Sequence, residues 1–287
     1  MTNILEAIYN IVNQKHFQIK EFYSSSNRAN NMGEALENYI KDAFAGTFYT
    51  QDKIKRLEIF EKKFSWLGSQ NNPPDIMIKG GDAIEVKKIQ GNGSSLALNS
   101  SYPKADLQSS SPMITKECKS CEDWDVKDMI YCVGNVDDTK LKSLWLVYGS
   151  IYCAKHETYQ RIKNTISEGI KAIHNVVFSE TKELGRVNQV DPLGITNLRI
   201  RGMWQIEHPK KVYNYLHASG NQDFELVCII PNEKYKSFPK ESRFKIENMK
   251  EQGFSIENSK VKNPNNPAKL IDCKLIKFIS KCKEHIV

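Results

Sequence analysis

The stretch between Asn72 and Lys88 constrains the fold of this chain more than any other segment. It reads NPPDIMIKGGDAIEVKK, in which apolar and polar residues alternate on both sides of a Gly-Gly pair. Alternation with a period of two predicts two β-strands, and paired glycines supply the backbone freedom that a tight hairpin turn requires. We therefore expect a short antiparallel hairpin that turns at Gly80 and Gly81.

The predicted hairpin gathers three charged side chains at one point. Asp75 begins the first strand, while Glu85 and Lys87 lie two residues apart on the second strand and therefore share one face. Two neighbouring carboxylates repel each other unless a cation lies between them, and Mg²⁺ prefers oxygen ligands of this kind. We expect Asp75 and Glu85 to bind Mg²⁺ and Lys87 to serve the attacking water in phosphodiester hydrolysis. The alternative is an exposed hairpin that carries ordinary surface charges.

These residues also carry a resemblance to a known group of nucleases. Pro74-Asp75, followed after nine residues by Glu85-Val86-Lys87, resembles the motif of the PD-(D/E)xK nucleases. More narrowly, the chain is similar to the NgoPII-type type II restriction endonucleases over roughly residues 3 to 210. The other matching words are Asn27-Arg28-Ala29-Asn30 leading to Gly33-Glu34-Ala35-Leu36-Glu37, and Asp191-Pro192-Leu193-Gly194-Ile195 running to Arg199-Ile200-Arg201-Gly202-Met203-Trp204.

The resemblance implies a Mg²⁺-dependent enzyme that cleaves double-stranded DNA at a short GC-rich palindrome such as GGCC. It also implies a cognate DNA methyltransferase that protects the host DNA. In nucleases of this class, a helix before the hairpin often adds a glutamate to the metal site. Glu37 matches that place better than Glu34, and a glutamate on the helix surface is the other interpretation. Because a symmetric DNA site needs one active site for each strand, we expect a homodimer.

Composition and charge indicate the class of partner and the cellular location that we expect for this protein. The formal net charge of +7 suits a polyanionic partner such as DNA. The sequence has no apolar run of about 18 residues that would predict a membrane span. Its first residues lack the basic and then apolar layout of a signal peptide. We therefore expect a cytoplasmic protein that has no membrane partner.

Hydrophobic periodicity predicts an α/β fold, in which helices cover both faces of a mixed central sheet. The expected helices span residues 2–13, 32–45, 51–64 and 152–177, and the expected strands after the hairpin span 129–133, 144–149, 213–216 with 224–230, and 270–278. The residues expected to face the core from the third and fourth helices are Ile54, Leu57, Ile59, Phe60, Ile162, Ile166, Ile170 and Ile173. We expect a single domain, with its catalytic core at about residues 30–180 and its DNA-recognition elements at about 180–287.

Two polar segments are candidates for contact with DNA, the first with its backbone or minor groove and the second with its phosphates. The loop before the second helix carries Arg28 and Asn30, and the Gly-, Ser- and Asn-rich segment after the hairpin carries Asn99, Ser101 and Lys104. Side chains of these types hold phosphates in many protein–DNA interfaces. The alternatives are a solvated linker for the first segment and disorder for the second.

A third segment, residues 180–202, is a candidate for reading the bases. It contains Arg186, Asn188, Arg199 and Arg201, and arginine pairs with guanine while asparagine pairs with adenine. The alternation from Leu198 to Arg201 places both arginines on one strand face, so that Leu198 and Ile200 should face the core. The alternative is a solvated strand edge.

The cysteines allow one further metal site. Cys118, Cys121, Cys153 and His156 have the residue types of a Cys₃His zinc site. However, Cys153 follows an apolar segment that is typical of a buried core, and reduced thiols are the usual state in a cytosolic protein. The sequence leaves the zinc site open and favours free thiols.

Two other functions remain possible on the residues alone. The first is a repair or recombination nuclease that reads DNA shape, and the second is a DNA-binding protein whose acidic hairpin is only structural. A requirement for Mg²⁺ would separate the second from any nuclease. A fixed pattern of DNA fragments would separate a restriction enzyme from the first.

Overall fold

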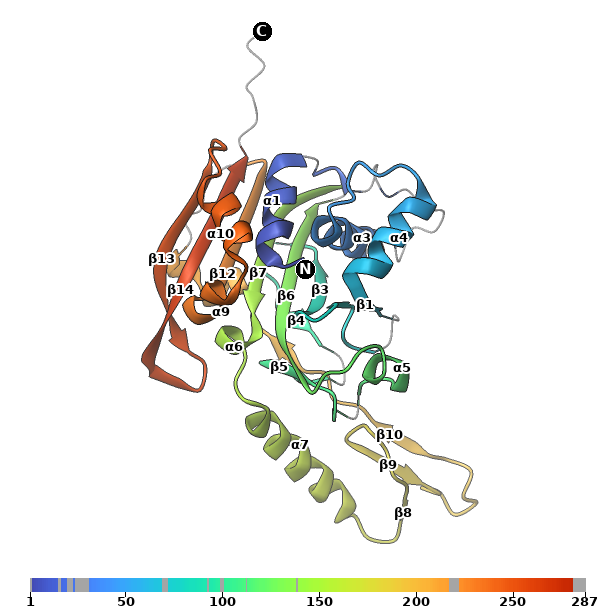
Figure 1. The fold of residues 1–287 in the computed structure, drawn as a ribbon. Coiled ribbons are helices and arrows are strands. Elements are labelled where there is room, and N and C mark those ends of the chain that lie inside the picture. Colours follow the sequence, from blue (N-terminus) through green and yellow to red (C-terminus); the bar gives the residue numbers. More distant parts are fainter. Residues whose placement is uncertain are drawn as a thin grey trace.

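A mixed sheet forms the centre of the fold (Figure 1). The computed structural model describes residues 2–14, 17–19, 23, 31–68, 72–91, 93–98, 101–111, 113–137, 139–216 and 222–280. Along the sheet lie β1 (Phe64–Leu67), β2 (Ile76–Ile78), β3 (Ala83–Ile89), β6 (Val126–Asp137), β7 (Lys140–Tyr148), β12 (Phe224–Pro231), β14 (Asn266–Ser280) and β13 (Phe254–Asn263). β5 (Asp106–Gln108) pairs with the start of β6. β3 runs parallel to β6 and β7 runs parallel to β12, while the other pairs are antiparallel, so the predicted mixed α/β class is confirmed.

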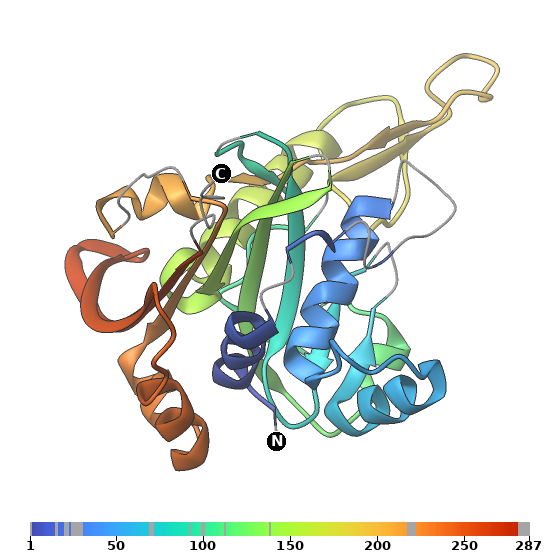
Figure 2. The same ribbon diagram turned by 90° about the horizontal axis from the view of Figure 1, so that it is seen from above.

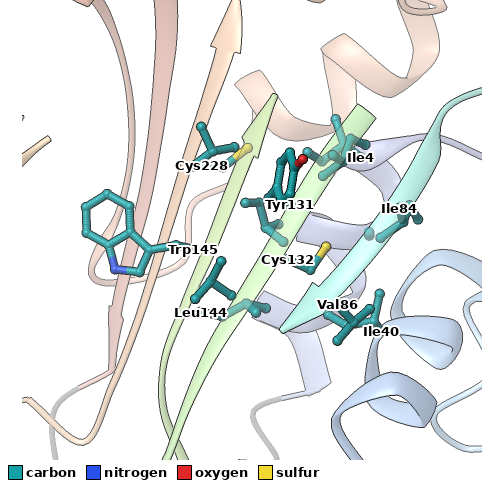
Figure 3. Packing of buried hydrophobic residues seen from close by; sticks show 14 of the residues in the cluster. Ile4, Ile40, Ile84, Val86, Tyr131, Cys132, Leu144, Trp145 and Cys228 are labelled. Carbon is teal, nitrogen blue, oxygen red and sulfur yellow. The ribbon is translucent and has the colours of Figure 1, made fainter. Parts of the chain in front are cut away.

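Two helices cover one face of this sheet. α1 (Ile4–Gln14) and α3 (Asn31–Ala45) lie side by side against the strands (Figure 2). Ile4 and Ile40 from these helices lie close to Val86 and Cys132 of the sheet, whereas Trp145 points to the opposite face (Figure 3). α3 approaches so closely that a β-carbon on residue 134, a glycine, would lie 2.7 Å from the side chain of Leu36. Residue 134 lies on β6, so this contact packs α3 on the sheet next to β3, the strand that carries the predicted catalytic residues.

The remaining elements lie around the sheet. The other helices are α4 (Lys53–Lys63), α5 (Lys116–Lys119), α6 (Gly149–Tyr152), α7 (His156–Lys171), α8 (Pro209–Val212), α9 (Asn232–Ser237), α10 (Lys240–Glu247) and a 3-10 helix (Asn214–Leu216). A small sheet pairs β4 (Leu96–Ala97) with β11 (Gln205–Ile206), and another contains β8 (Val177–Phe178), β9 (Gly185–Asn188) and β10 (Leu198–Ile200). None of the helices among the described residues is long and apolar enough to span a membrane.

α7 and the sheet of β8, β9 and β10 project from the body of the molecule (Figure 1). We call residues 156–201 the arm. α7 buries none of its residues, so the prediction that its isoleucines face the core was wrong: Ile162, Ile166 and Ile173 are exposed, and Ile170 is partly covered. The reason is positional, because α7 leaves the main sheet and packs on the small sheet of the arm and, through His156 and Tyr159, against Tyr102 and Trp204.

Other expectations about local structure also need correction. In α4, Ile54 and Leu57 are exposed, Ile59 is partly exposed and Phe60 alone is buried, since the helix lies beyond the edge strand β1. The segment at Tyr213 is helical rather than extended, because the tyrosine hydroxyl donates a hydrogen bond to the carbonyl of Ile151 and docks the segment on α6.

The end of the chain contributes to the main sheet. β12 and β14 continue the sheet that contains the hairpin, and β13 pairs with β14 over most of its length. The segment beyond residue 180 therefore does not lie apart from the core, and only its first part belongs to the arm. The division into a catalytic core and recognition elements stays a prediction.

Candidate active site

The turn of the β2–β3 hairpin is held from outside by an ion pair. Lys127 donates hydrogen bonds to the carbonyls of Ile78 (3.3 Å) and Gly81 (2.8 Å), and its ammonium lies 2.5 Å from Glu122. Glu122 in turn accepts a hydrogen bond from the backbone N–H of Gly80, at 2.8 Å. Gly80 has a φ of 65°, which the absence of a side chain permits. The register of the two strands is therefore fixed at the turn, and with it the position of the charged residues.

Asp75 lies directly before β2 and beside β3. Its backbone N–H donates to the carbonyl of Ile84 (3.1 Å), and its carboxylate Oδ2 accepts a hydrogen bond from the N–H of Val86 (2.6 Å). Since Ile76 pairs with Ile84, Asp75 lies opposite Glu85 across the hairpin. The sequence-based expectation that pairing brings these two carboxylates together agrees with this geometry.

Glu85 and Lys87 share a face of β3 and contact each other. The Lys87 ammonium lies 2.6 Å from Oε1 of Glu85, whose side chain is only 13% exposed. The other carboxylate oxygen, Oε2, is buried and has no hydrogen-bond partner among the described residues. A buried carboxylate oxygen without a partner is costly, so Oε2 of Glu85 is a free ligand position for a cation.

The electrostatics of Asp75 and Lys87 reflect this crowding. Burial, followed by the charge of Glu85, raises the pKa of Asp75 to about 8, although Lys87 and the Val86 N–H oppose the shift. Burial by itself would lower the pKa of Lys87, but Glu85, Asp75 and Glu37 together raise it above its ordinary value. With both Asp75 and Glu85 ionised, the site would carry more negative charge than the Lys87 ammonium neutralises, so it favours either a proton on Asp75 or a bound cation.

α3 brings one of its glutamates to the same place. The charge of Glu37 raises the pKa of both Asp75 and Lys87, and its carboxylate also lies 3.8 Å from the ammonium of Lys41. Glu34 is exposed one turn earlier on the helix. Between these two, Glu37 is the glutamate that has an electrostatic effect on the hairpin.

These residues fit a hard divalent cation. Asp75 and the free Oε2 of Glu85 supply two carboxylates, and Mg²⁺ typically binds one or two carboxylates together with water and substrate phosphates. Among the described residues, no group of three or more His, Cys, Asp or Glu side chains has a geometry that could hold a metal ion by itself. The remaining ligands of an ion here would therefore come from water and from the substrate.

The four possible zinc ligands have separate surroundings. Cys118 is buried with its sulfur 3.4 Å from that of Met77, whereas His156 lies 2.7 Å from the hydroxyl of Tyr102. Burial raises the pKa values of the Cys118 and Cys153 thiols to about 12, and zinc binds the thiolate form. Cys121 contacts the carbonyl of Cys118. The part of the chain that the structure describes thus assembles no Cys₃His group from them.

Of the predicted backbone contacts, two lie near the hairpin. Arg28, Asn30 and Asn99 lie outside the described residues. Lys104 donates a hydrogen bond to the hydroxyl of Ser101, and its ammonium is close enough to Glu85 and Lys87 for both charges to affect its pKa. The loop before β5 therefore brings a second lysine toward the hairpin.

The four residues that were expected to read bases all lie in the arm. Arg199 lies opposite Arg186 across β10 and β9, so their side chains share one face of the small sheet. Asn188, two residues from Arg186 and on the same face, donates to the hydroxyl of Ser179 at 3.0 Å. The alternation of arginines with apolar residues holds. However, Leu198 does not face the core: it is 50% exposed, because α7 covers this face beside Gly185 instead.

A glutamate that the sequence did not single out connects two of these arginines. Oε2 of Glu183 lies 2.6 Å from Nε of Arg199, and its Oε1 lies 2.7 Å from Nε of Arg201. Both arginine side chains remain 60% exposed. No local pattern marks Glu183, since its role depends on the fold of the β9–β10 hairpin.

The comparisons with known proteins identify the family of the chain. The family model of the NgoPII restriction endonuclease matches residues 2–262. The chain is 48% identical over 278 residues to the type II restriction enzyme NgoPII of Neisseria gonorrhoeae, which covers 96% of this chain and 99% of that one. No solved structure matches the chain. With a catalytic motif at the hairpin and a match over nearly its whole length, the chain belongs to the NgoPII restriction endonuclease family.

Proposed function

We propose that this protein is a type II restriction endonuclease that hydrolyses double-stranded DNA at a short palindromic site. The observation that carries the proposal is the group of Asp75, Glu85 and Lys87, in which one buried carboxylate oxygen has no partner. The 48% identical relative, which is named a type II restriction enzyme, supports the same activity. Site-specific phosphodiester hydrolysis accounts for both the charged group at the hairpin and the similarity to that relative.

Asp75 and Glu85 are the proposed metal ligands, and Mg²⁺ is the proposed ion. A bound divalent ion supplies positive charge to the phosphate and lowers the pKa of a water molecule. Asp75 must lose its proton to act as a ligand, and burial opposes this loss until the cation enters. Glu37 is proposed to assist from α3.

Lys87 is proposed to orient the attacking water. Its raised pKa keeps the side chain protonated, so that it donates hydrogen bonds rather than accepting a proton. Oε1 of Glu85 holds the ammonium at 2.6 Å and thereby aims it across the hairpin. A fixed ammonium beside the reacting phosphate also stabilises the negative charge that develops in the transition state.

The proposed contacts to DNA divide into two groups. Arg28, Asn30, Asn99, Ser101 and Lys104 would hold the backbone, while Arg186, Asn188, Arg199 and Arg201 on the arm would reach base edges. A GC-rich palindrome such as GGCC suits arginine, because arginine pairs with guanine through two hydrogen bonds.

A palindrome presents one scissile bond on each strand. We therefore propose a homodimer with two-fold symmetry, in which each copy cuts one strand. A cognate methyltransferase in the same cytoplasm would protect the host DNA. This partner is functional, and a physical complex with the enzyme is not required.

Digestion of plasmid DNA tests the proposal. Wild-type protein is incubated with plasmid in Mg²⁺, in EDTA and in EDTA followed by excess Mg²⁺, and Glu85→Gln serves as the inactive control. We expect a fixed set of fragments that requires Mg²⁺ and that Glu85→Gln does not produce. A smear of random fragments would favour a repair or recombination nuclease, and binding without cleavage in Mg²⁺ would favour a non-catalytic DNA-binding protein.

A further inference from the structure

A polar cavity lies between the loop before β5 and the first half of α7. Its volume is about 220 Å³, several times the roughly 30 Å³ that one water molecule occupies in the liquid. The side chains that can bind an anion there are Ser101, Lys104, Ser111, His156, Lys163 and Asn164. No Asp or Glu is among the described residues that line it. The cavity therefore offers hydrogen-bond donors and positive charge together.

Lys104 is the deepest cation of this cavity. Its ammonium donates to the Ser101 hydroxyl and lies 3.4 Å from the carbonyl of Tyr102, and it forms no ion pair within the described part of the chain. Burial lowers its pKa, and the charge of Lys163 acts in the same direction. A lysine kept inside a protein without a carboxylate is costly, and an anion in the cavity would remove that cost.

The cavity is adjacent to the catalytic hairpin. The charges of Glu85 and Lys87 both act on Lys104. The backbone N–H of Lys104 donates to the hydroxyl of Tyr131 at 2.7 Å, and Tyr131 lies beside Glu85 in the parallel pair of β6 and β3. A DNA strand whose scissile phosphate lies at Asp75 and Glu85 would therefore bring a neighbouring phosphate to Lys104.

The far wall of the cavity belongs to the arm. His156 is held by the hydroxyl of Tyr102 at 2.7 Å, and Lys163 donates to the backbone carbonyl of Lys182 at 3.1 Å. Lys182 lies one residue before Glu183, which pairs with the base-reading arginines. The cavity thus lies between the hairpin and the part of the arm that carries those arginines.

We propose that this cavity is a phosphate site that takes the DNA backbone phosphate next to the scissile one, held by Lys104 from the hairpin side and by Lys163 from the arm. The inference rests on the proposed function, because it assigns the DNA strand a path from the active site toward the arm. Phosphate is the fitting ligand because two ammonium groups, hydroxyls and an amide surround the cavity without any carboxylate.

The test is a thermodynamic cycle between a protein side chain and one DNA phosphate. Affinity is measured in EDTA, so that no strand is cut, for a duplex that contains a cleaved sequence and for duplexes in which one phosphate at a time is a neutral methylphosphonate. The variants are Lys163→Met and, as a matched control, Lys171→Met, which removes an exposed lysine of the same helix that does not line the cavity.

We expect wild-type affinity to fall roughly ten- to a hundredfold when the phosphate flanking the scissile one is neutralised. Lys163→Met should lose part of that factor on the unmodified duplex and show a smaller further loss at that position, because Lys104 still contacts the phosphate, whereas Lys171→Met should keep the wild-type sensitivity. Lys104→Met, which retains the side-chain length, should behave as Lys163→Met does. If Lys163→Met and Lys171→Met respond alike at every position, the inference is wrong.

Two further measurements are needed. The first distinguishes DNA phosphate from free phosphate as the ligand, and the second tests the phosphate site independently of the proposed nuclease function. Inorganic phosphate that enters the cavity should displace DNA more readily from wild type than from Lys163→Met. Phosphate binding to the free protein that depends on Lys163 but does not compete with DNA would assign the cavity to free phosphate instead. The salt dependence of binding to a random duplex should fall by about 0.9 for Lys163→Met and not for Lys171→Met. This measurement needs no cleavage, so it tests the phosphate-site proposal even if the plasmid digestion shows no cleavage. If the enzyme cleaves DNA but its salt dependence is unchanged in Lys163→Met, the phosphate-site proposal is wrong and the proposed function stands.

Discussion

The β2–β3 hairpin and the arm hold their charges in opposite ways. In the hairpin, burial raises the pKa of Asp75 to about 8, and Oε2 of Glu85 stays without a partner among the described residues. In the arm, the hydrogen bond from Arg199 lowers the pKa of Glu183, which also pairs with Arg201. The hairpin therefore needs a proton or a cation to hold both of its carboxylates, whereas in the arm Glu183 is already paired with two arginines.

This difference matches two kinds of ligand. A site with excess carboxylate and a fixed backbone suits a small cation whose place must be accurate. The arm, where α7 buries no residue, suits a large ligand that offers many new partners to exposed side chains. On this argument, substitutions in the hairpin should affect the chemical step and substitutions in the arm should affect the choice of DNA. The predictions below test that division.

The largest effect should come from the two proposed metal ligands. Asp75→Asn and Glu85→Gln keep the shape of each side chain but remove its charge, so cleavage should be abolished while DNA affinity persists. Affinity in EDTA should rise for Glu85→Gln, because this change removes a negative charge near the phosphates. Single-turnover cleavage and affinity in EDTA measure the two quantities, and the exposed Asp123→Asn is the control. A variant that still cuts near the wild-type rate would exclude that residue from the site.

Lys87→Met should reduce the cleavage rate by roughly 10²- to 10⁴-fold, the range for a group that positions a proton or stabilises developing charge. Lys88→Met is the matched control, because Lys88 pairs with Gly134 on the face that α3 covers. Its effect should be small. The reverse order of effects would mean that the strand alternation has been assigned to the wrong residues.

The hairpin could be predicted from the sequence because its interactions are local. Asp75 and Glu85 are ten positions apart, so strand pairing across one turn is enough to bring them together. Glu37 could not be predicted from the local pattern alone, and it was singled out because the resemblance to a nuclease family pointed to its helix. Its effect on Asp75 depends on the packing of α3 against β3.

The rest of the site could not be predicted because its contacts join distant segments. Lys104 was expected only to hold DNA, and its closeness to Glu85 arises from the return of the loop before β5 toward β6. The isoleucines of α7 follow a helical period that predicts a buried face, yet the period says nothing about whether another element covers that face.

Substitutions in the arm should reduce the preference for the cleaved sequence over other DNA rather than slow the cleavage step. Arg199→Ala and Arg201→Ala should each weaken binding to a cleaved sequence by about 1–3 kcal/mol more than binding to a scrambled duplex, if at least one arginine reaches a guanine. Affinities are measured on both duplexes over a series of salt concentrations. Equal losses on both duplexes, with a salt dependence reduced by about one, would make the arginines backbone contacts.

Glu183→Gln should have a smaller effect on the same measurement. The glutamate holds both guanidinium groups in the free protein, so its loss should reduce discrimination for the two arginines together by about 1 kcal/mol, while general affinity for DNA rises slightly. Glu180→Gln is the control, because it removes a charge from the same segment without a pair to either arginine. An unchanged discrimination would show that DNA orients the arginines without help from Glu183.

The last prediction concerns stability rather than DNA, and it sets Asp75 against Glu183 directly. The folded protein keeps the proton of Asp75 up to about pH 8, whereas the unfolded chain releases it near the ordinary pKa of 3.8. The contribution of this group to stability is therefore fully present below about pH 4 and is lost as the pH rises to about 8, with a slope of at most about 1.4 kcal/mol per pH unit. The lowered pKa of Glu183 has the opposite sign.

Thermal unfolding in EDTA between pH 5 and about pH 8.5 should show the loss in wild type. Asp75→Asn should flatten the curve, and this difference isolates Asp75 from other buried carboxylates such as Asp82. Added Mg²⁺ should raise the melting temperature of wild type more at about pH 8 than at about pH 6, because the metal replaces the proton. Parallel curves for wild type and Asp75→Asn would mean that Asp75 is already ionised in the folded protein, and the charge contrast between hairpin and arm would then disappear.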